Sequence, residues 1–455
     1  MAQPKIIVLD DDPTGSQTVH SCLLLLQWDV ETLRQGLRDA SPIFFVLTNT
    51  RALAAAAAEQ VTREVCQNLK AAIALEGVQD FLVVSRSDST LRGHYPVETD
   101  AIAGVLGPFD AHFLVPAFFE GGRITRNSIH YLMVDGVPTP VHQTEFAKDS
   151  VFGYSTSYLP DYAAEKTAGL IQADAVERFT LEDIRAGSLD RLLALEHNVC
   201  CAVDGETQAD LNQFAQDLLI AAAQGKKFLF RSAASILTAL AALPPQPIDA
   251  SHMSTYVRGG RPGAIVIGSH VKKTTQQLEQ LLQEPGVTGI EVNVAYLRDL
   301  QSVREPTRDE YPSRNRGPAA HSQLLADILT QVTQAHSEGQ VPVVYTSRDE
   351  LTFDTVQARL DFGVEVSSLL MDVIKELPAD IGFLISKGGI TSNDTLSTGL
   401  ALRMARLLGQ ILPGVSAVRT PADHVQFPDL PVVLFPGNVG DGDALALAYR
   451  RLMGL

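Results

Sequence analysis

Cysteine is scarce in this 455-residue chain, and the pattern of its four cysteines excludes two common uses of that residue. Cys22, Cys66, Cys200 and Cys201 include no Cys-x-x-Cys pair, and two adjacent cysteines cannot readily chelate one ion or bridge to each other. We therefore expect reduced, buried thiols, as in a cytoplasmic protein.

Long apolar runs are absent as well. No run of eighteen apolar residues occurs, so no segment predicts a membrane-spanning helix. Residues 1–5 lead directly into an apolar strand pattern, without the basic start, apolar stretch and cleavage site of a signal peptide. These absences indicate a cytoplasmic location without membrane association.

Basic residues are outnumbered, with 36 Lys and Arg against 53 Asp and Glu and a formal charge of −17. A charge of that sign argues against nonspecific binding to nucleic acid or to an anionic membrane, since both require basic patches. The negative net charge does not exclude binding of an anionic small molecule, because a few basic side chains can gather in one cleft.

Short apolar runs alternate with segments of helical composition along the whole chain. Strands are expected at residues 6–9, 43–47, 81–85, 113–115, 199–203 and 227–230, and again at 264–267, 289–292, 341–346, 381–385 and 432–435. Helices are expected at residues 52–75, after capping boxes at Thr180 and Thr207, and over 351–375 and 395–408. Apolar strands separated by helices predict parallel sheets covered on both faces.

A stretch rich in Pro and Gly at residues 243–263 interrupts this alternation and is expected to be a linker. We therefore predict an α/β fold of two domains, residues 1–245 and 260–455, each a mostly parallel sheet flanked by helices. Ligands of open parallel sheets bind beyond the carboxyl ends of the strands. The active site is expected at these strand ends, in the cleft between the domains. The polar stretch 304–321 is expected to be a surface excursion.

Polar clusters follow four strands of the first half. Three carboxylates stand in a row in Asp10-Asp-Asp-Pro-Thr-Gly-Ser16, where they repel one another unless a cation or a hydroxyl-rich ligand shares them. A helix-capping Asx-turn is the alternative. A guanidinium ends Thr48-Asn-Thr-Arg51, where it can hold a carboxylate bidentately or form a plain salt bridge.

Two arginines and an aspartate stand among hydroxyls in Ser85-Arg-Ser-Asp-Ser-Thr-Leu-Arg-Gly-His94, a composition that suits a polyhydroxylated anion. Residues 116–126 fit either a turn or a binding loop. In the second half, loops at residues 268–274, 386–392 and 435–443 each follow a strand and precede a helix. Their glycines bare backbone N–H groups, which suits phosphate, although none is a P-loop and no G-x-G-x-x-G occurs. The residues thus predict a polyol-anion site and a phosphate site, as in a small-molecule kinase.

These motifs resemble those of the four-carbon acid sugar kinase family. Asp11-Asp-Pro-Thr-Gly15 is similar to its DDxTG signature, and Arg86-Ser-Asp-Ser-Thr-Leu-Arg-Gly93 to its basic-x-DSTLRG segment. Lys387-Gly-Gly-Ile-Thr391 and Phe435-Pro-Gly-Asn-Val-Gly440 look like the two glycine loops of its nucleotide domain. The likeness covers nearly the whole chain, with departures at Ile390 and at Phe230-Arg-Ser-Ala-Ala234.

The resemblance implies an N-terminal domain that binds the acid sugar and a C-terminal domain that binds ATP. Together they would phosphorylate threonate, erythronate or a keto-tetronate, with ATP and Mg²⁺. A homodimer is one assembly that we expect. It places substrate contacts on Asp11, Asp12, Arg51, Arg86, Ser87, Asp88, Ser89 and Arg92. It places nucleotide contacts on Ser269, Gly388, Gly389, Ile390, Thr391, Gly437 and Gly440.

Phosphoryl transfer needs positioning and charge neutralisation more than covalent chemistry. We expect Arg51, Arg86 and Arg92 to hold the acid, either Asp12 or Asp88 to accept the proton, and Mg²⁺ to bridge the phosphates. Two alternatives stay open at this point: a non-catalytic sugar-acid-binding or regulatory protein, and a metal-dependent phosphate-ester hydrolase that uses the three consecutive aspartates.

Overall fold

The computed structural model describes residues 3–302, 316–348, 351–437 and 439–455. These residues form two compact units: unit 1 contains Met1–Gln246 with Arg403–Gly409, and unit 2 contains Pro247–Leu402 with Gln410–Leu455. Of the expected surface excursion at 304–321, residues 304–315 lie outside the described residues and the rest begin a helix. No helix among the described residues is long and apolar enough to cross a membrane.

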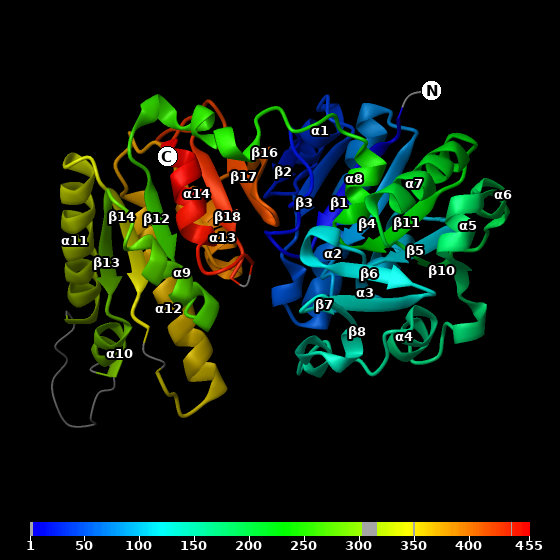
Figure 1. Ribbon diagram of the computed structural model, residues 1–455, viewed down its shortest axis with the longest axis horizontal. Coiled ribbons are helices and arrows are strands. Elements are labelled where there is room, and N and C mark those ends of the chain that lie inside the picture. Colours follow the sequence, from blue (N-terminus) through cyan, green and yellow to red (C-terminus); the bar gives the residue numbers. More distant parts are fainter. Residues whose placement is uncertain (1–2, 303–315, 349–350, 438) are drawn as a thin grey trace. The chain divides into compact units, whose positions relative to one another are not determined.

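Unit 1 is built on a mostly parallel sheet whose strands run in the order β16-β2-β3-β1-β4-β11-β5-β10-β9 (Figure 1). Its strands are β1 (Lys5–Asp10), β2 (Leu23–Leu25), β3 (Ile43–Leu47), β4 (Phe81–Arg86), β5 (Ala111–Val115), β9 (Glu177–Phe179), β10 (Val199–Val203), β11 (Phe228–Ser232) and the first part of β16 (Met404–Leu412). Within this sheet, the pairing of β16 with β2 is the only antiparallel one among the strand pairs described. The register sets Asp10 level with Leu47 and with Arg86, and Arg86 level with Ser232. Polar residues that end three neighbouring strands therefore lie side by side.

Helices cover both faces of this sheet. They are α1 (Val30–Arg38), α2 (Ala55–Glu76), α3 (Val97–Leu106), α4 (Leu159–Lys166), α5 (Leu181–Ala186), α6 (Leu189–Ala194), α7 (Gln208–Ala223) and α8 (Ser235–Ala241). One face packs Leu33 of α1, Leu69 of α2 and Ile102 of α3 against alternate strand residues such as Ile7. On the other face Phe214 of α7 meets the Phe113 ring edge-on. The buried apolar strands thus leave only their polar ends for a site.

A small antiparallel sheet of β6 (Arg123–Arg126), β7 (Ile129–Val134) and β8 (Val137–Pro140) follows β5. The sequence analysis did not predict it, because its strands are short and half-exposed and lack a continuous apolar run. It carries Arg123 and His130, whose Nε2 lies 2.8 Å from the Ser89 carbonyl. This small sheet therefore braces the loop that follows β4.

Unit 2 repeats the architecture, with strand order β13-β14-β12-β15-β18-β17 (Figure 1). Its strands are β12 (Ala264–Ile267), β13 (Val287–Val292), β14 (Val341–Thr346), β15 (Leu384–Lys387), β17 (Val415–Arg419) and β18 (Pro431–Phe435), of which β17 is antiparallel to β18. Its helices are α9 (Lys272–Leu281), α10 (Val294–Ser302), α11 (Arg316–Ser337), α12 (Val356–Lys375), α13 (Gly389–Asp394) and α14 (Ala444–Met453). The carboxyl ends of β12, β15 and β18 lie together at one edge.

The expected α/β class, with mostly parallel strands flanked by helices, is confirmed, although the main strands of both units belong to one 15-stranded sheet and not to two separate sheets. The capping boxes of α5 and α7 are confirmed as well. Every expected strand is present, with starts shifted by up to three residues. The helix expected over 395–408 is wrong beyond residue 399: Thr395–Gly399 is a π-helical turn, and β16 begins at Met404. Met, Ala, Arg and Leu favour helix locally, but pairing with β2 overrides that preference.

Candidate active site

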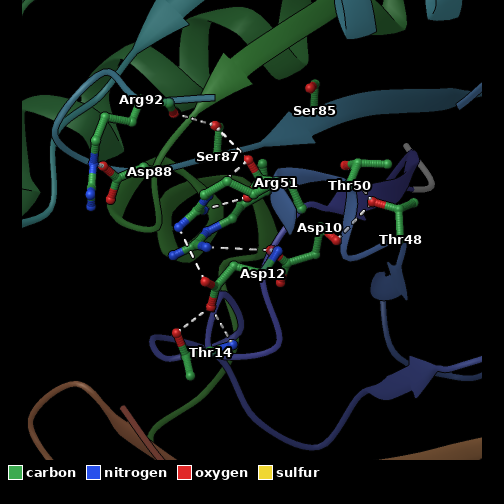
Figure 2. A network of polar contacts seen from close by, with 12 residues as sticks. Asp10, Asp12, Thr14, Thr48, Thr50, Arg51, Ser85, Ser87, Asp88 and Arg92 are labelled. Atoms are coloured by element: carbon green, nitrogen blue, oxygen red, sulfur yellow. Dashed lines mark hydrogen bonds and ion pairs between the residues drawn. The ribbon is translucent and has the colours of Figure 1, made fainter. Parts of the chain in front are cut away.

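Three consecutive carboxylates end β1, and a guanidinium lies among them (Figure 2). Arg51 grips Asp11 with two nitrogens, Nη2 at 2.5 Å from Oδ1 and Nε at 3.2 Å from Oδ2, and its Nη1 lies 3.1 Å from Asp12 Oδ2. Thr14 donates its backbone N–H to Asp12 Oδ1 at 2.8 Å. The Asp12 side chain is 24% exposed, against 2% for Asp11. Asp12 is thus the carboxylate of this group that a ligand can reach.

Asp10 lies deepest of the three. Its Oδ1 is 3.4 Å from Arg86 Nη1, both side chains are buried, and its Oδ2 has no hydrogen-bond partner among the described residues. Burial raises the pKa of Asp10 to about 7, although Arg86 opposes that shift. Burial also acts to raise the pKa of Asp12, but Arg51, Arg86 and the Thr14 hydrogen bonds outweigh it and hold the pKa below its usual range.

The sequence predicts that a cation or a hydroxyl-rich ligand shares the triplet, and in the structure two arginines of the chain supply cationic groups there. Arg51 and Arg86 already occupy the positions from which a cation would neutralise these carboxylates. No group of three or more His, Cys, Asp or Glu side chains in the described part of the chain is arranged to hold a metal. The triplet therefore does not fit a resident metal ion.

The loop after β4 brings a second carboxylate–arginine pair to the same edge of the sheet (Figure 2). Asp88 accepts from Arg92 Nε at 2.8 Å and from the Thr90 hydroxyl. Burial acts to raise the pKa of Asp88, but Arg51 and Arg92 outweigh it and hold the pKa well below its usual range. Ser87 Oγ donates to Asp11 Oδ2 at 2.8 Å, so this loop is tied to the aspartates that follow β1.

Gly93 lets this loop pass close to the aspartates. Its φ is +126°, and a Cβ at this position would lie 2.4 Å from Ser87 Oγ, 2.5 Å from Arg231 Nη2 and 3.1 Å from Asp11 Oδ2. Few side chains tolerate such a φ, and none would fit the space. The glycine is therefore required for the packing of this cluster.

Three charged residues beside the cluster, Glu98, Arg123 and Arg231, are not among the predicted site residues. Arg231 on β11 donates to Glu98 Oε2 at 2.5 Å and to Ser85 Oγ at 2.7 Å. Arg123 stacks over the Phe118 ring, and its buried Nε has no partner among the described residues. A charged residue closing the apolar run Phe228–Ser232 was the available signal for Arg231.

A small hollow opens between these loops. Its lining includes Ser87, Asp88, Arg92, Tyr162, Arg231 and Ser232. The polar part of the lining combines two guanidiniums with hydroxyls and one carboxylate, and Leu91, Leu114, Pro116 and Leu159 complete it. The hollow therefore offers donors and acceptors to a short polyhydroxylated anion beside an apolar wall.

In unit 2 the loops that follow β12, β15 and β18 meet at one edge of the sheet. A Cβ on Gly388, whose φ is +122°, would lie 3.0 Å from Thr391 Oγ1 and 3.2 Å from the Ser269 Cβ. Thr274 Oγ1 lies 3.1 Å from Ser269 Oγ and donates to the Gly437 carbonyl at 3.1 Å. Ser269, Gly388, Thr391 and Gly437 are thus brought together.

Three further predicted nucleotide contacts differ in their surroundings. Ile390 is 74% exposed, and a Cβ on Gly389 would meet nothing within 4 Å. A Cβ on Gly440 would lie 2.4 Å from that of Ala444, so this glycine is needed where the chain turns into α14.

An apolar cavity of about 250 Å³ lies beside these loops, and the sequence analysis did not predict it. Phe353, Phe362, Leu370 and Val294 line it together with His270, Thr346, Arg359 and Thr391. The two phenylalanine rings are 5.2 Å apart at their centroids. The cavity shares Gly268, Ile390 and Thr391 with the glycine loops, so one ligand can reach both.

Comparison with known proteins identifies the family. A family model described as a sugar-binding N-terminal domain matches residues 6–240, and one described as a nucleotide-binding C-terminal domain matches residues 264–445. A D-erythronate kinase of Heliobacterium modesticaldum is 26% identical over 90% of this chain and 99% of its own. The chain belongs to the four-carbon acid sugar kinase family.

A second relative has a related name, and two solved structures share the fold. A D-threonate kinase of Bordetella bronchiseptica is 32% identical over 35% of this chain and 39% of its own. A protein of Salmonella typhimurium LT2 has a similar fold, with a TM-score of 0.70 and 17% identity over 99% of this chain and all of its own. Haemophilus influenzae protein HI1011 has a similar fold as well, with a TM-score of 0.63 and 17% identity over 98% of this chain and all of its own.

Proposed function

We propose that the protein is an ATP-dependent kinase that phosphorylates a hydroxyl group of a four-carbon sugar acid. The observation that carries the proposal is the combination of an arginine- and hydroxyl-lined carboxylate cluster in unit 1 with glycine loops beside an apolar cavity in unit 2. The first suits a polyhydroxylated anion, and the second suits the phosphates and base of a nucleotide. Relatives named D-erythronate kinase and D-threonate kinase support the same substrate class.

The acid's carboxylate is assigned to Arg92 and Arg51, because their side chains are 27% and 19% exposed. Arg51 has N–H groups left after it binds Asp11 and Asp12, so it can orient these aspartates and still contact the acid. Arg86 is nearly buried and holds Asp10, so its role in the proposal is to fix the base of the cluster. Ser87 and Ser89 belong to the same loop and complete the set of predicted contacts.

Asp12 is the proposed acceptor of the proton from the attacking hydroxyl. Its pKa lies below the usual range, so the carboxylate is ionised at neutral pH and can accept a hydrogen bond from that hydroxyl. Asp88, the other candidate, is held by Arg92 and Thr90 and is better suited to keeping Arg92 in place. A weak base suffices, because proton transfer comes late in a loose phosphoryl-transfer transition state.

The nucleotide is assigned to unit 2, with the base in the cavity between Phe353 and Leu370 and the phosphates at Ser269, Gly388 and Gly437. Mg²⁺ bound to the phosphates of ATP would neutralise their charge during transfer. A location in the cytoplasm and assembly as a homodimer remain predictions.

The proposal is tested by screening the protein with MgATP against the stereoisomers of four-carbon aldonates and their keto acids. Formation of ADP that depends on one acid, with a phosphorylated acid detected by mass spectrometry, supports the kinase. Hydrolysis of a phosphorylated acid without ATP would support a hydrolase instead. Binding of an acid by calorimetry without any ADP formation would support a non-catalytic binding protein.

A further inference from the structure

A lysine lies buried beneath the glycine loops of unit 2, and no carboxylate among the described residues forms an ion pair with it. Lys387, the last residue of β15, is 0% exposed. Its Nζ donates to the Pro436 carbonyl at 2.5 Å and to the Gly437 carbonyl at 3.2 Å, and it lies 4.2 Å from the centroid of the Phe435 ring. An ammonium without a carboxylate partner is costly to bury, so its presence here indicates a function.

The first consequence of this contact is geometric. A trans peptide is planar, so the carbonyl of Pro436 and the N–H of Gly437 point in opposite directions. Because the carbonyl oxygen of Pro436 accepts a hydrogen bond from Lys387 Nζ, the N–H of Gly437 in the same peptide is directed away from Nζ. Thr274 reinforces the arrangement by donating its hydroxyl to the Gly437 carbonyl at 3.1 Å. The loop after β18 is thereby fixed with a backbone donor turned outward.

The second consequence is electrostatic. Burial and, to a smaller extent, the charge of Lys273 on α9 together lower the pKa of Lys387 to about 7. The other groups that contact Nζ are the two carbonyls and the Phe435 ring, which carry no net charge. An anion bound at the neighbouring glycine loops would raise this pKa again, because a nearby negative charge favours the protonated form. Binding of such an anion near pH 8 would therefore take up a proton.

We infer that Lys387 is a positioning residue for the phosphates of the nucleotide, which it serves by turning the carbonyls of the β18 loop inward and by adding a buried positive charge beneath that loop. The inference rests on the proposed function and adds to it a residue that is not among the predicted nucleotide contacts. It also gives the nucleotide site a proton linkage.

Calorimetric titration with MgADP at pH 8.5, in two buffers of different ionisation enthalpy, tests the inference without any sugar acid. We expect the wild-type protein to take up between about half a proton and one proton per MgADP, and Lys387→Met to take up none. The variant should bind MgADP about ten- to a hundredfold more weakly, as loss of a charge-assisted contact typically gives. The exposed Lys375→Met serves as the matched control and should behave as wild type.

The outcomes separate this inference from the proposed function. If the wild-type protein binds MgADP without proton uptake and Lys387→Met binds it equally well, the lysine only ties the loop and the inference is overturned. Should Lys387→Met fail to fold, wild-type proton uptake still decides. In that case Thr274→Val, which keeps the lysine, should weaken MgADP binding by less than the roughly ten- to hundredfold expected for Lys387→Met. This variant should still take up as many protons per MgADP as the wild-type protein. If the wild-type protein binds no nucleotide, the proposed function is overturned together with the inference.

Discussion

Each of the three carboxylates at the end of β1 is paired with an arginine, and this pairing determines how the site responds to substitution. Asp11 is bound in two places by Arg51, Asp12 in one, and Asp10 is buried against Arg86. Removal of a single charge therefore leaves its buried partner uncompensated. Substitutions that keep the shape of a side chain are the informative ones here.

Asp12→Asn is expected to lower kcat by at least about a hundredfold while leaving the fold intact, because the amide retains the shape but cannot accept the proton. Steady-state kinetics with the acid identified in the substrate screen measures the loss. MgADP affinity serves as the control and should stay within about twofold of wild type, since Asp12 belongs to unit 1. A near wild-type kcat would exclude Asp12 as the proton acceptor.

The pH dependence of stability is expected to carry the signature of Asp10. Its pKa in the folded protein, about 7, lies above the ordinary value of 3.8. The folded state thus holds the proton more tightly than the unfolded state, and stability falls as the pH rises from about 4 to about 7. The loss is on the order of a few kcal/mol.

Thermal unfolding at pH 5 and pH 8 tests this expectation when wild type is compared with Asp10→Asn, which cannot ionise. The difference in Tm between the two pH values should be smaller in the variant. An unchanged difference would mean that Asp10 does not titrate in this interval.

At the scale of elements, the loops that end the strands carry the site, and their glycines fix how closely those loops approach. Gly93→Ala is expected to abolish most activity and to destabilise the fold. The positive φ costs about 1–3 kcal/mol, and the added Cβ would collide with Ser87 and Arg231. Gly136→Ala is the matched control, because its φ is also positive, +79°, and a Cβ there would meet nothing within 4 Å. If both variants lose activity equally, backbone strain alone accounts for the effect of the first.

Gly388→Val is expected to raise the KM for ATP about tenfold or more and to leave the KM for the acid nearly unchanged. The φ of +122° opposes a β-branched residue, and the new side chain would press on Ser269 and Thr391. Gly339→Val, at a φ of +75° with open space around it, controls for strain in unit 2. A change in the acid's KM alone would contradict the assignment of the nucleotide to this unit.

The sequence predicted those elements that depend on local pattern. Apolar runs such as Ile43–Leu47 mark buried parallel strands by themselves, and Thr207 with Asp210 marks the start of α7. The polar loops could be found because they follow such strands. The cavity of unit 2 could not be found, since Phe353, Phe362 and Leu370 look like any other core residues until the chain is folded. The neutralisation of the triplet by Arg51 and Arg86 also depends on strand register, which one sequence does not reveal.

At the scale of the whole molecule, the chain returns to unit 1 after most of unit 2. Met404, Ala405 and Arg406 pair antiparallel with Leu25, Leu24 and Leu23 of β2. Arg406 also binds Asp39 through two hydrogen bonds of 2.6 and 3.0 Å. These seven residues, Arg403–Gly409, therefore cover the edge of the sheet of unit 1.

A fragment that ends at Gln246 is expected to associate with itself, because β2 would then present unpaired backbone groups and three leucines. Light scattering and sedimentation measure the association. The same fragment with residues 403–409 attached through a flexible linker should remain a monomer or show markedly less association. Equal behaviour of the two fragments would mean that β2 needs no cover.

This return of the chain also has a consequence for biosynthesis. A protein chain emerges from the ribosome from its N-terminus at about 5–20 residues per second, so unit 1 waits roughly ten to thirty seconds between the release of residue 246 and that of residue 409. During this interval the nascent unit 1 has an open edge beside its central strands. While β2 is exposed in the growing chain, it offers a binding surface to a chaperone or to a neighbouring nascent copy.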